Sequence, residues 1–234
     1  MNVNKTPELA RELYKRIRLV RRDMGDLLFH FTRAPEGSFV KVSQGKDYEM
    51  TMSATASAVL HKILYEGQIR GTSTWTNGYP CVCFTEAPIQ EFNSIFALVE
   101  LASSQNERPR YEPYGLAVSK NWLFERGGRP VIYDSPDALD QYHAGQQWRF
   151  VPYDPATGVD FSWEREWRIN VEALKLDPKH TLVVVPSADE AFDLVYEFST
   201  VEADWDDDGP CGTYHAPRWL AVSLDLFGFT AVGG

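Results

Sequence analysis

Short apolar runs that recur along the chain, separated by polar segments, constrain its fold more than any other feature. These runs are rich in Val, Ile, Leu, Phe and Tyr, as β-strands are. Other segments carry apolar residues at helical spacing. The sequence therefore predicts a protein of the α+β class. The expected strands are Asp26–Thr32, Pro80–Thr85, Tyr114–Ser119, Val131–Tyr133, Asp160–Ile169, Thr181–Val185 and Leu220–Leu226. Tyr114–Ser119 and Val131–Tyr133 are expected to form a hairpin or to lie side by side around a loop.

A basic amphipathic helix is expected at the start of the chain. Thr6 is a suitable N-cap and Pro7 suits the first helical position. An apolar stripe follows, formed by Leu9, Leu13, Ile17, Val20 and Met24. The other faces carry a basic cluster, Lys15, Arg16, Arg18, Arg21 and Arg22. This cluster is either a solvated surface or a contact with nucleic acid or an acidic partner. We expect this helix to occupy residues 1–25 and one domain to fill residues 26–234.

Further helices are predicted between the strands. Thr55–Glu66 has an apolar side, and Gly67 is a natural C-cap. Thr85 and Glu86 are suitable N-caps for a helix near Ile89–Ser103. Two more helices are expected, at Asp137–Gln147 and Ala188–Phe198. Between Arg33 and Ser53 we expect a polar connection with short strands.

Composition excludes several classes of protein. The 234 residues are 44% hydrophobic, enough for a real core, and the net charge of −10 argues against coating nucleic acid by bulk electrostatics. The 3 cysteines form neither a disulfide framework nor a CxxC pair. No apolar run is long enough for a membrane span, and no signal-peptide pattern opens the chain. These features predict a soluble cytoplasmic protein without a membrane partner.

The stretch Asp160–Ile169 is the first candidate for chemistry. If it is a strand, Glu164, Glu166 and Arg168 share one face, because side chains alternate along a strand. Such a face is either the solvated side of a sheet or the wall of a cleft. Arg168 is the expected ion-pair partner of either carboxylate.

Two other strands end in polar residues. His30 and Thr32 share a face of the first strand, where His30 is either a hydrogen-bonded core residue or part of a polar site. Thr85 ends a strand that contains Cys81 and Cys83, both expected to be buried. The acidic run from Glu202 to Asp208 lacks the spacing of a calcium loop and is expected to be solvated; no metal site is predicted.

The order of these pieces resembles the abortive-infection phage-resistance proteins of the AbiGi type and, more distantly, the DarT-like ADP-ribosyltransferases. The matching segments lie within residues 27–170. They are Phe29–Thr32, Leu60–Gly67, Cys83–Glu86, Gly127–Tyr133 and Glu164–Arg168.

The resemblance implies a split, mostly antiparallel sheet with flanking helices and a cleft that binds NAD as a substrate. His30 matches the first-strand residue that contacts NAD, with Thr32 beside it. Glu166 matches the catalytic glutamate, and Glu164 the residue that orients the acceptor. A carboxylate near the ribose would oppose the positive charge of an oxocarbenium-like transition state. Three more NAD-site candidates of lower rank are Thr85, Tyr133 and Trp163.

The resemblance further implies a toxin or phage-defence effector. Its acceptor is open between nucleic acid and protein, water is a third acceptor, and an antitoxin or defence-system partner is implied. The rest of the family triad has no convincing match, although Arg70, Ser73 and Tyr79 are available. One alternative is a non-catalytic binding partner or sensor with the same fold. Another is a magnesium-dependent nuclease that uses Asp160 together with the two glutamates.

Overall fold

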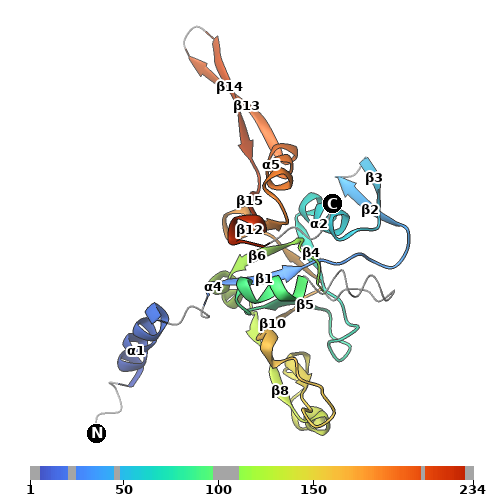
Figure 1. Cartoon of the computed structure of the whole chain (residues 1–234), viewed down its shortest axis with the longest axis vertical. Helices are drawn as coiled ribbons and strands as arrows, with labels where there is room; N and C mark the ends of the chain where they lie inside the picture. Colours follow the sequence, from blue (N-terminus) through green and yellow to red (C-terminus); the bar gives the residue numbers. More distant parts are fainter. Residues whose placement is uncertain (1–5, 21–24, 45–47, 97–110, 207–208, 230–234) are drawn as a thin grey trace.

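A computed structural model describes residues 6–20, 25–44, 48–96, 111–206 and 209–229 of the chain. Its centre is one large sheet, in the order β15-β12-β6-β1-β5-β10-β7 (Figure 1). All neighbouring strands in it are antiparallel except β12 and β15. The strands are β1 (Leu27–Phe31), β5 (Cys81–Thr85), β6 (Gly115–Ser119), β7 (Arg129–Pro130), β10 (Glu166–Asn170), β12 (Thr181–Val185) and β15 (Leu220–Ser223).

Four strand pairs surround this sheet. Three are antiparallel, and the pair of β8 and β9 is parallel. The pairs are β2 (Phe39–Gln44) with β3 (Tyr48–Ser53), β4 (Gln68–Arg70) with β11 (Ala173–Lys175), β8 (Ile132–Asp134) with β9 (Phe150–Pro152), and β13 (Ser199–Asp206) with β14 (Gly209–Pro217). The helices with both ends described are α1 (Thr6–Val20), α2 (Ala56–Glu66), α4 (Lys120–Glu125) and α5 (Ala188–Glu197). Residues 92–96 are also helical. Short 3-10 turns are η2 (Ile89–Glu91), η3 (Pro136–Gln141), η4 (Gln147–Arg149), η5 (Ser162–Glu164), η6 (Pro178–His180) and η7 (Leu224–Phe227).

Apolar side chains cover both faces of the sheet. On one face, which we call the α2 face, the core contains Leu28, Phe84, Leu116 and Trp167 of the sheet together with Ile63 of α2. On the other, the Phe92 face, the core contains Phe29, Ala117 and Val184 of the sheet together with Phe92, Phe96 and Leu224. Neighbouring residues of one strand therefore belong to different cores, as the alternation of side chains requires.

Helix α2 follows the expectation from the sequence closely. Thr55 is its N-cap, and its side chain accepts a hydrogen bond from the Ala58 amide. Gly67 ends the helix with a φ of 64°, and its amide bonds to the carbonyl of Ile63. A left-handed residue at this place closes the last turn of a helix, and glycine adopts it without steric cost.

Several predicted elements differ from the structure. Val131–Tyr133 does not lie beside Tyr114–Ser119, because β7 pairs with β10 and β8 pairs with β9. The helix at Asp137–Gln147 is wrong as well: η3 ends at Gln141, and the next residue is extended. The predicted strand Leu220–Leu226 ends at Ser223, where η7 begins. The described part of the acidic run, residues 202–206, lies in β13, which pairs with β14 as a hairpin. Residues 207–208 are not among the described residues. Two other predicted helices are described only in part, because residues 97–110 of one and residues 21–24 of the other are not among the described residues.

Candidate active site

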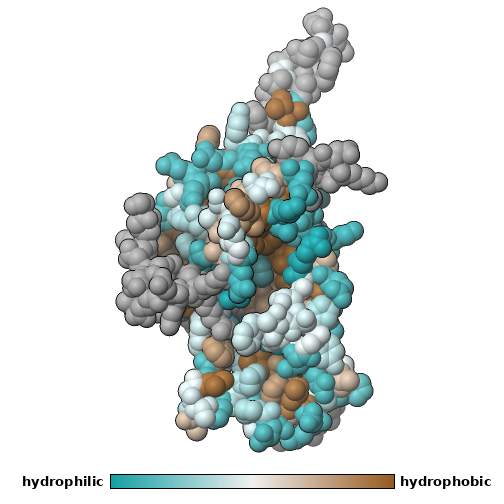
Figure 2. All heavy atoms as spheres, turned by 90° about the vertical axis from the view of Figure 1, so that its right-hand side faces the viewer, coloured by the Kyte–Doolittle hydropathy of each residue, from teal (hydrophilic) through white to brown (hydrophobic). Residues whose placement is uncertain are grey.

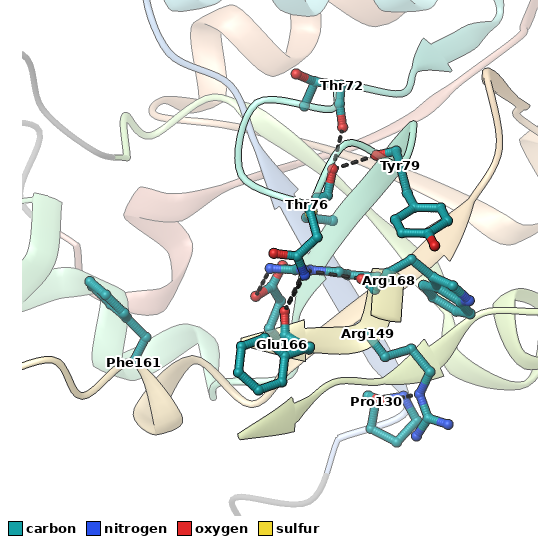
Figure 3. A network of polar contacts seen from close by, with 12 residues as sticks. Thr72, Thr76, Tyr79, Pro130, Arg149, Phe161, Glu166 and Arg168 are labelled. Atoms are coloured by element: carbon teal, nitrogen blue, oxygen red, sulfur yellow. Dashed lines mark hydrogen bonds and ion pairs between the residues drawn. The ribbon is translucent and has the colours of Figure 1, made fainter. Parts of the chain in front are cut away.

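The Glu166 carboxylate is held by Arg168 on the Phe92 face of the sheet. Arg168 Nε donates to Glu166 Oε1 at 2.7 Å, and Nη2 donates to Oε2 at 3.1 Å. The side chains are 12% and 5% exposed, so this is a largely buried ion pair. Figure 3 shows the two groups facing each other. The expected pairing of Arg168 with a neighbouring glutamate is confirmed, and it fixes the direction of the carboxylate.

Arg168 also anchors the chain that passes over it. Its Nη1 donates to the carbonyls of Trp148 and Phe150, at 3.0 and 3.1 Å. Burial acts to lower the pKa of Arg168, but the hydrogen bonds and negative charge of Glu166 outweigh burial and raise it. The guanidinium is therefore charged, and it ties β10 to η4 and β9.

Glu164 does not share the strand face of Glu166. It ends η5, and Arg165 takes a left-handed conformation with a φ of 47°, so β10 begins only at Glu166. Strand β5 holds this turn in place, because Thr85 Oγ1 donates a hydrogen bond to the Glu164 carbonyl at 2.6 Å. Glu164 itself is 5% exposed. The expected strand over Asp160–Ile169 is thus wrong in its first half.

Thr85 and Tyr133 shape the main chain beside Glu166. Thr85 lies in register with Glu166 across the β5–β10 ladder. Its hydroxyl also accepts from the Ala87 amide at 3.1 Å, whereas the N-cap of η2 is Pro88, which makes no side-chain cap bond. Neither Thr85 nor Glu86 is therefore the cap predicted for that helix.

The Tyr133 hydroxyl accepts from the Glu166 amide at 3.0 Å and donates to the Phe161 carbonyl at 3.2 Å. Burial raises the pKa of Tyr133 to about 12. The phenol is therefore neutral near pH 7 and serves as a clamp on the start of β10. Trp163 is 42% exposed and packs near Phe92 and Tyr111.

His30 lies on the opposite face of the sheet from Glu166. Phe29, Thr85 and Glu166 form one row across β1, β5 and β10, so the next row contains His30, Phe84 and Trp167. The rings of His30 and Phe84 are 5.7 Å apart, which agrees with this assignment. The structure therefore brings Thr85, Tyr133 and Glu166 together but sends the His30 side chain to the α2 face.

The hydrogen bond of His30 identifies its tautomer. Its Nδ1 lies 2.8 Å from the Cys83 carbonyl oxygen, and a carbonyl only accepts, so Nδ1 carries the proton. Burial lowers the pKa of His30, which favours the neutral ring. In that form Nε2 has a lone pair and can accept a hydrogen bond from a ligand hydroxyl.

A cavity of about 390 Å³ lies beside His30, between α2, β2 and β4. Its apolar lining includes Val59, Ile63 and Ile69. Its polar lining includes Lys41, Lys62, Glu66, Gln68 and Arg70. Figure 2 shows hydrophobic atoms gathered in the middle of the side of the molecule on which β2 and β3 lie, bordered by hydrophilic ones. The volume and the mixed lining are those of a small-molecule site.

The sequence reasoning missed most of this cavity. Lys62 and Glu66 lie four residues apart on α2, a spacing that puts them on one helix face, and this was the available signal. Arg70 lines the cavity, whereas Ser73 is exposed and the Tyr79 hydroxyl donates to the Ala144 carbonyl at 2.9 Å. The latter two take no part in either site.

Thr32 is 3% exposed, and its hydroxyl lies within hydrogen-bond distance of the Ala56 and Tyr114 carbonyls, at 2.9 and 3.0 Å. It therefore joins β1 to the start of α2. Within the described part of the chain, no group of three His, Cys, Asp or Glu side chains could hold a metal ion. No helix of that part is long and apolar enough to cross a membrane.

The chain was compared with protein-family models, with curated proteins and with solved structures, and none of the three comparisons gives a match. The geometry of the mostly antiparallel sheet, the Glu166–Arg168 pair and the His30 cavity therefore carries the functional argument.

Proposed function

We propose that this chain is an ADP-ribosyltransferase-like enzyme that cleaves the nicotinamide–ribose bond of NAD. The proposal rests on the position of β5 in the main sheet. This strand lies between β1, which bears His30, and β10, which bears Glu166, and Thr85 is in register with Glu166. Neighbouring strands are about 4.8 Å apart, so β1 and β10 are about 10 Å apart. One extended dinucleotide is long enough to contact both.

Because His30 and Glu166 lie on opposite faces of the sheet, one NAD molecule could contact both only if the sheet opened between β1 and β5. The β1–β5 ladder has a single residue pair, Phe29 with Thr85. At the next residue the His30 ring, instead of the backbone, bonds to the Cys83 carbonyl of β5. The two strands are thus joined by few bonds beside the cavity, but Phe84 and Thr85, 2% and 4% exposed, fill the junction. These side chains would have to move for NAD to reach from the cavity to Glu166.

The cavity suits the adenosine diphosphate half of NAD. Lys41, Lys62 and Arg70 line the cavity and would bind the phosphates by exchanging their present partners, Glu49 for Lys41 and Glu66 for the other two. The apolar lining suits a nucleobase. His30 Nε2 would accept a hydrogen bond from a ribose hydroxyl. We assign these contacts because the charge, the apolar surface and the lone pair match the phosphates, the base and the ribose hydroxyls of NAD.

Glu166 suits the bond-breaking step. Arg168 occupies one lone pair on each carboxylate oxygen, and each oxygen can accept a further bond. A fixed carboxylate beside the ribose would stabilise positive charge at the anomeric carbon as nicotinamide leaves. The burial of Glu164 disfavours the acceptor-orienting role that the resemblance implies for it.

The decisive assay measures nicotinamide release from NAD by wild type and by Glu166→Gln. We expect a loss of at least about 100-fold in the variant, the scale of one electrostatic contact to a transition state. Glu86→Gln is the matched control, because Glu86 is also ion-paired, with Lys120, and is 15% exposed. Its other oxygen accepts from Trp167 Nε1, so it lies on the α2 face. Glu86→Gln should lower stability but keep the turnover of each folded molecule.

The acceptor and the biological role follow from a second experiment. NAD labelled in its ADP-ribose part is incubated with DNA, RNA and protein fractions, and the labelled fraction identifies the acceptor. Induced expression of wild type in bacteria should arrest growth and that of Glu166→Gln should not, as expected of a toxin or phage-defence effector. A wild type that neither binds nor consumes NAD contradicts the enzyme and leaves the non-catalytic binding partner as the better reading.

A further inference from the structure

Two arginines at the edge of the main sheet lack a counter-charge in the described part of the chain. Arg129 lies in β7, the last strand of the sheet, and Arg149 ends η4. Both side chains are partly exposed, so a ligand can reach them. Among the described residues, neither guanidinium has a carboxylate at ion-pair distance. The complete chain has a net charge of −10, so this is not due to a shortage of acidic residues.

The two guanidiniums lie close to each other. Arg149 Nε donates a hydrogen bond at 3.0 Å to the carbonyl of Pro130, the residue that follows Arg129. Figure 3 shows the Arg149 guanidinium beside Pro130. Burial, and then the positive charge of Arg129, lower the pKa of Arg149, as a like charge nearby does. Two positive charges therefore share one small area.

Hydrogen bonds to the main chain explain only part of each guanidinium. Arg129 Nη1 donates to the carbonyls of Phe124 and Gly128, at 2.8 and 2.6 Å, and Arg149 donates through Nε. Arg129 Nε and Nη2, and Arg149 Nη1 and Nη2, have no acceptor within the described residues. Each of these pairs of nitrogens forms a fork of N–H groups, which matches two oxygens of one phosphate.

Arg168 shows how this chain satisfies such a fork. Its Nε and Nη2 hold the two carboxylate oxygens of Glu166, and these are the same two nitrogens that Arg129 leaves unused. Arg129 lies in register with Arg168 across the β7–β10 ladder. Glu166 is engaged by Arg168, so the charge of Arg129 stays uncompensated. Like charges directly opposite each other destabilise a sheet, and a bound anion would offset this repulsion.

The ring beside Arg129 favours a ligand that also carries a flat group. The Arg129 guanidinium lies 4.0 Å from the centre of the Phe124 ring, and Phe124 is 49% exposed. Nucleobases stack on arginine planes and on aromatic rings. A nucleotide therefore matches this surface better than inorganic phosphate does.

We propose that Arg129 and Arg149 together bind one phosphate group of a nucleotide, which is either free or part of a single nucleic-acid strand. Arg129 binds through Nε and Nη2, and Arg149 binds through Nη1 and Nη2. The base lies against the exposed stack of Arg129 and Phe124. Neither arginine lines the His30 cavity, and binding here does not depend on cleavage of NAD.

The test measures binding of three probes to the full chain. AMP and inorganic phosphate are titrated by calorimetry, and a labelled single DNA strand of about ten nucleotides and mixed sequence is followed by fluorescence anisotropy. Wild type should bind AMP, the strand or both, and should bind inorganic phosphate more weakly. The probe that binds more tightly, AMP or the strand, identifies the source of the phosphate.

Substitutions then assign the binding to the two arginines. Arg129→Gln and Arg149→Gln should each weaken it at least about tenfold, because each removes a charged fork. Arg129→Lys should not restore it, since an ammonium group keeps the charge but cannot present a fork. Arg218→Gln is the matched control, because Arg218 also stacks on a ring, 5.0 Å from the centre of Trp219, and it should bind as wild type does.

The double variant tests whether both arginines hold the same phosphate. Arg129→Gln combined with Arg149→Gln should lose less affinity than the product of the two single losses, because the groups act on one ligand oxygen set. For the strand, the double variant should also reduce the slope of log affinity against log salt by about 0.7, the value of one phosphate contact.

Three outcomes overturn the proposal. The first is a wild type that binds neither AMP nor the strand at millimolar ligand. The second is a set of arginine variants that bind as tightly as wild type while circular dichroism shows them folded. The third is a double variant whose losses multiply, which would assign the two arginines to separate groups.

Discussion

Replacing Arg168 by methionine should destabilise the protein strongly. The change removes two hydrogen bonds to Glu166 and two to the carbonyls of Trp148 and Phe150. It also leaves the Glu166 carboxylate, 12% exposed, without its counter-charge. Removing one partner of a buried ion pair costs about 3–5 kcal/mol. For a chain of this length that corresponds to a fall in melting temperature of about 6–20 °C.

The magnitude can be assigned to the pair by a double-mutant cycle. We expect Arg168→Met and Glu166→Met together to cost about 2–3 kcal/mol less than the sum of the single changes, because no buried charge is left unpaired. The free energy of unfolding is measured by urea titration followed by tryptophan fluorescence.

The exposed pair of Lys41 and Glu49 serves as the control for this cycle. Its side chains are 73% and 55% exposed, and Lys41→Met should change stability by less than about 0.5 kcal/mol. If Arg168→Met behaves like Lys41→Met, or if the cycle shows no coupling, the reasoning about the buried pair is refuted.

Three further predictions concern other parts of the molecule. Because burial lowers the pKa of His30 below its ordinary 6.5, the unfolded chain binds the proton more tightly, so stability should fall as the pH drops below about 6.5. His30→Asn, which keeps a donor near the Cys83 carbonyl, should reduce this slope in melting curves at pH 5.5 and 7.5; an unchanged slope contradicts a neutral buried His30. Gly115→Ala would place a Cβ 2.4 Å from the His30 carbonyl oxygen and should cost about 1–3 kcal/mol in urea unfolding, whereas Gly212→Ala, with no atom within 4 Å, should cost less than about 0.5 kcal/mol. Burial raises the pKa of Cys81 and Cys83, so mass spectrometry should find neither alkylated by iodoacetamide at pH 8 in the folded protein and both alkylated in urea; equal labelling in both states would contradict their burial.

Local features of the fold could be predicted from the sequence because their causes lie within a few residues. One short segment contains the Thr55 cap, the apolar side of α2 and the Gly67 C-cap. All three predictions are confirmed. The same holds for β1, β5 and β12, whose apolar runs match strands of the main sheet. The pairing of Arg168 with Glu166 also needed only the two-residue period of a strand.

Errors arose where a distant segment decided the local conformation. The turn at Glu164 is held by Thr85, which lies 79 residues away in sequence, so the propensity of the local segment could not reveal it. The strand at Ile132 was expected beside β6, but its partner Phe150 follows it in the chain and forms a parallel pair. Pairing of this kind depends on which surfaces the rest of the fold leaves open.

The sequence by itself determined the α+β class, most strands of the main sheet, and the candidate residues His30, Thr85 and Glu166. Only the tertiary structure decided on which face of the sheet each of these side chains lies. Register across β1, β5 and β10 puts Glu166 with Thr85 on the Phe92 face and His30 on the α2 face beside a cavity. The physical reason is that a strand's two-residue period fixes which of its own residues share a face, but not which faces of different strands coincide. That relation is set by inter-strand hydrogen bonds, and it appears only when the chain is folded.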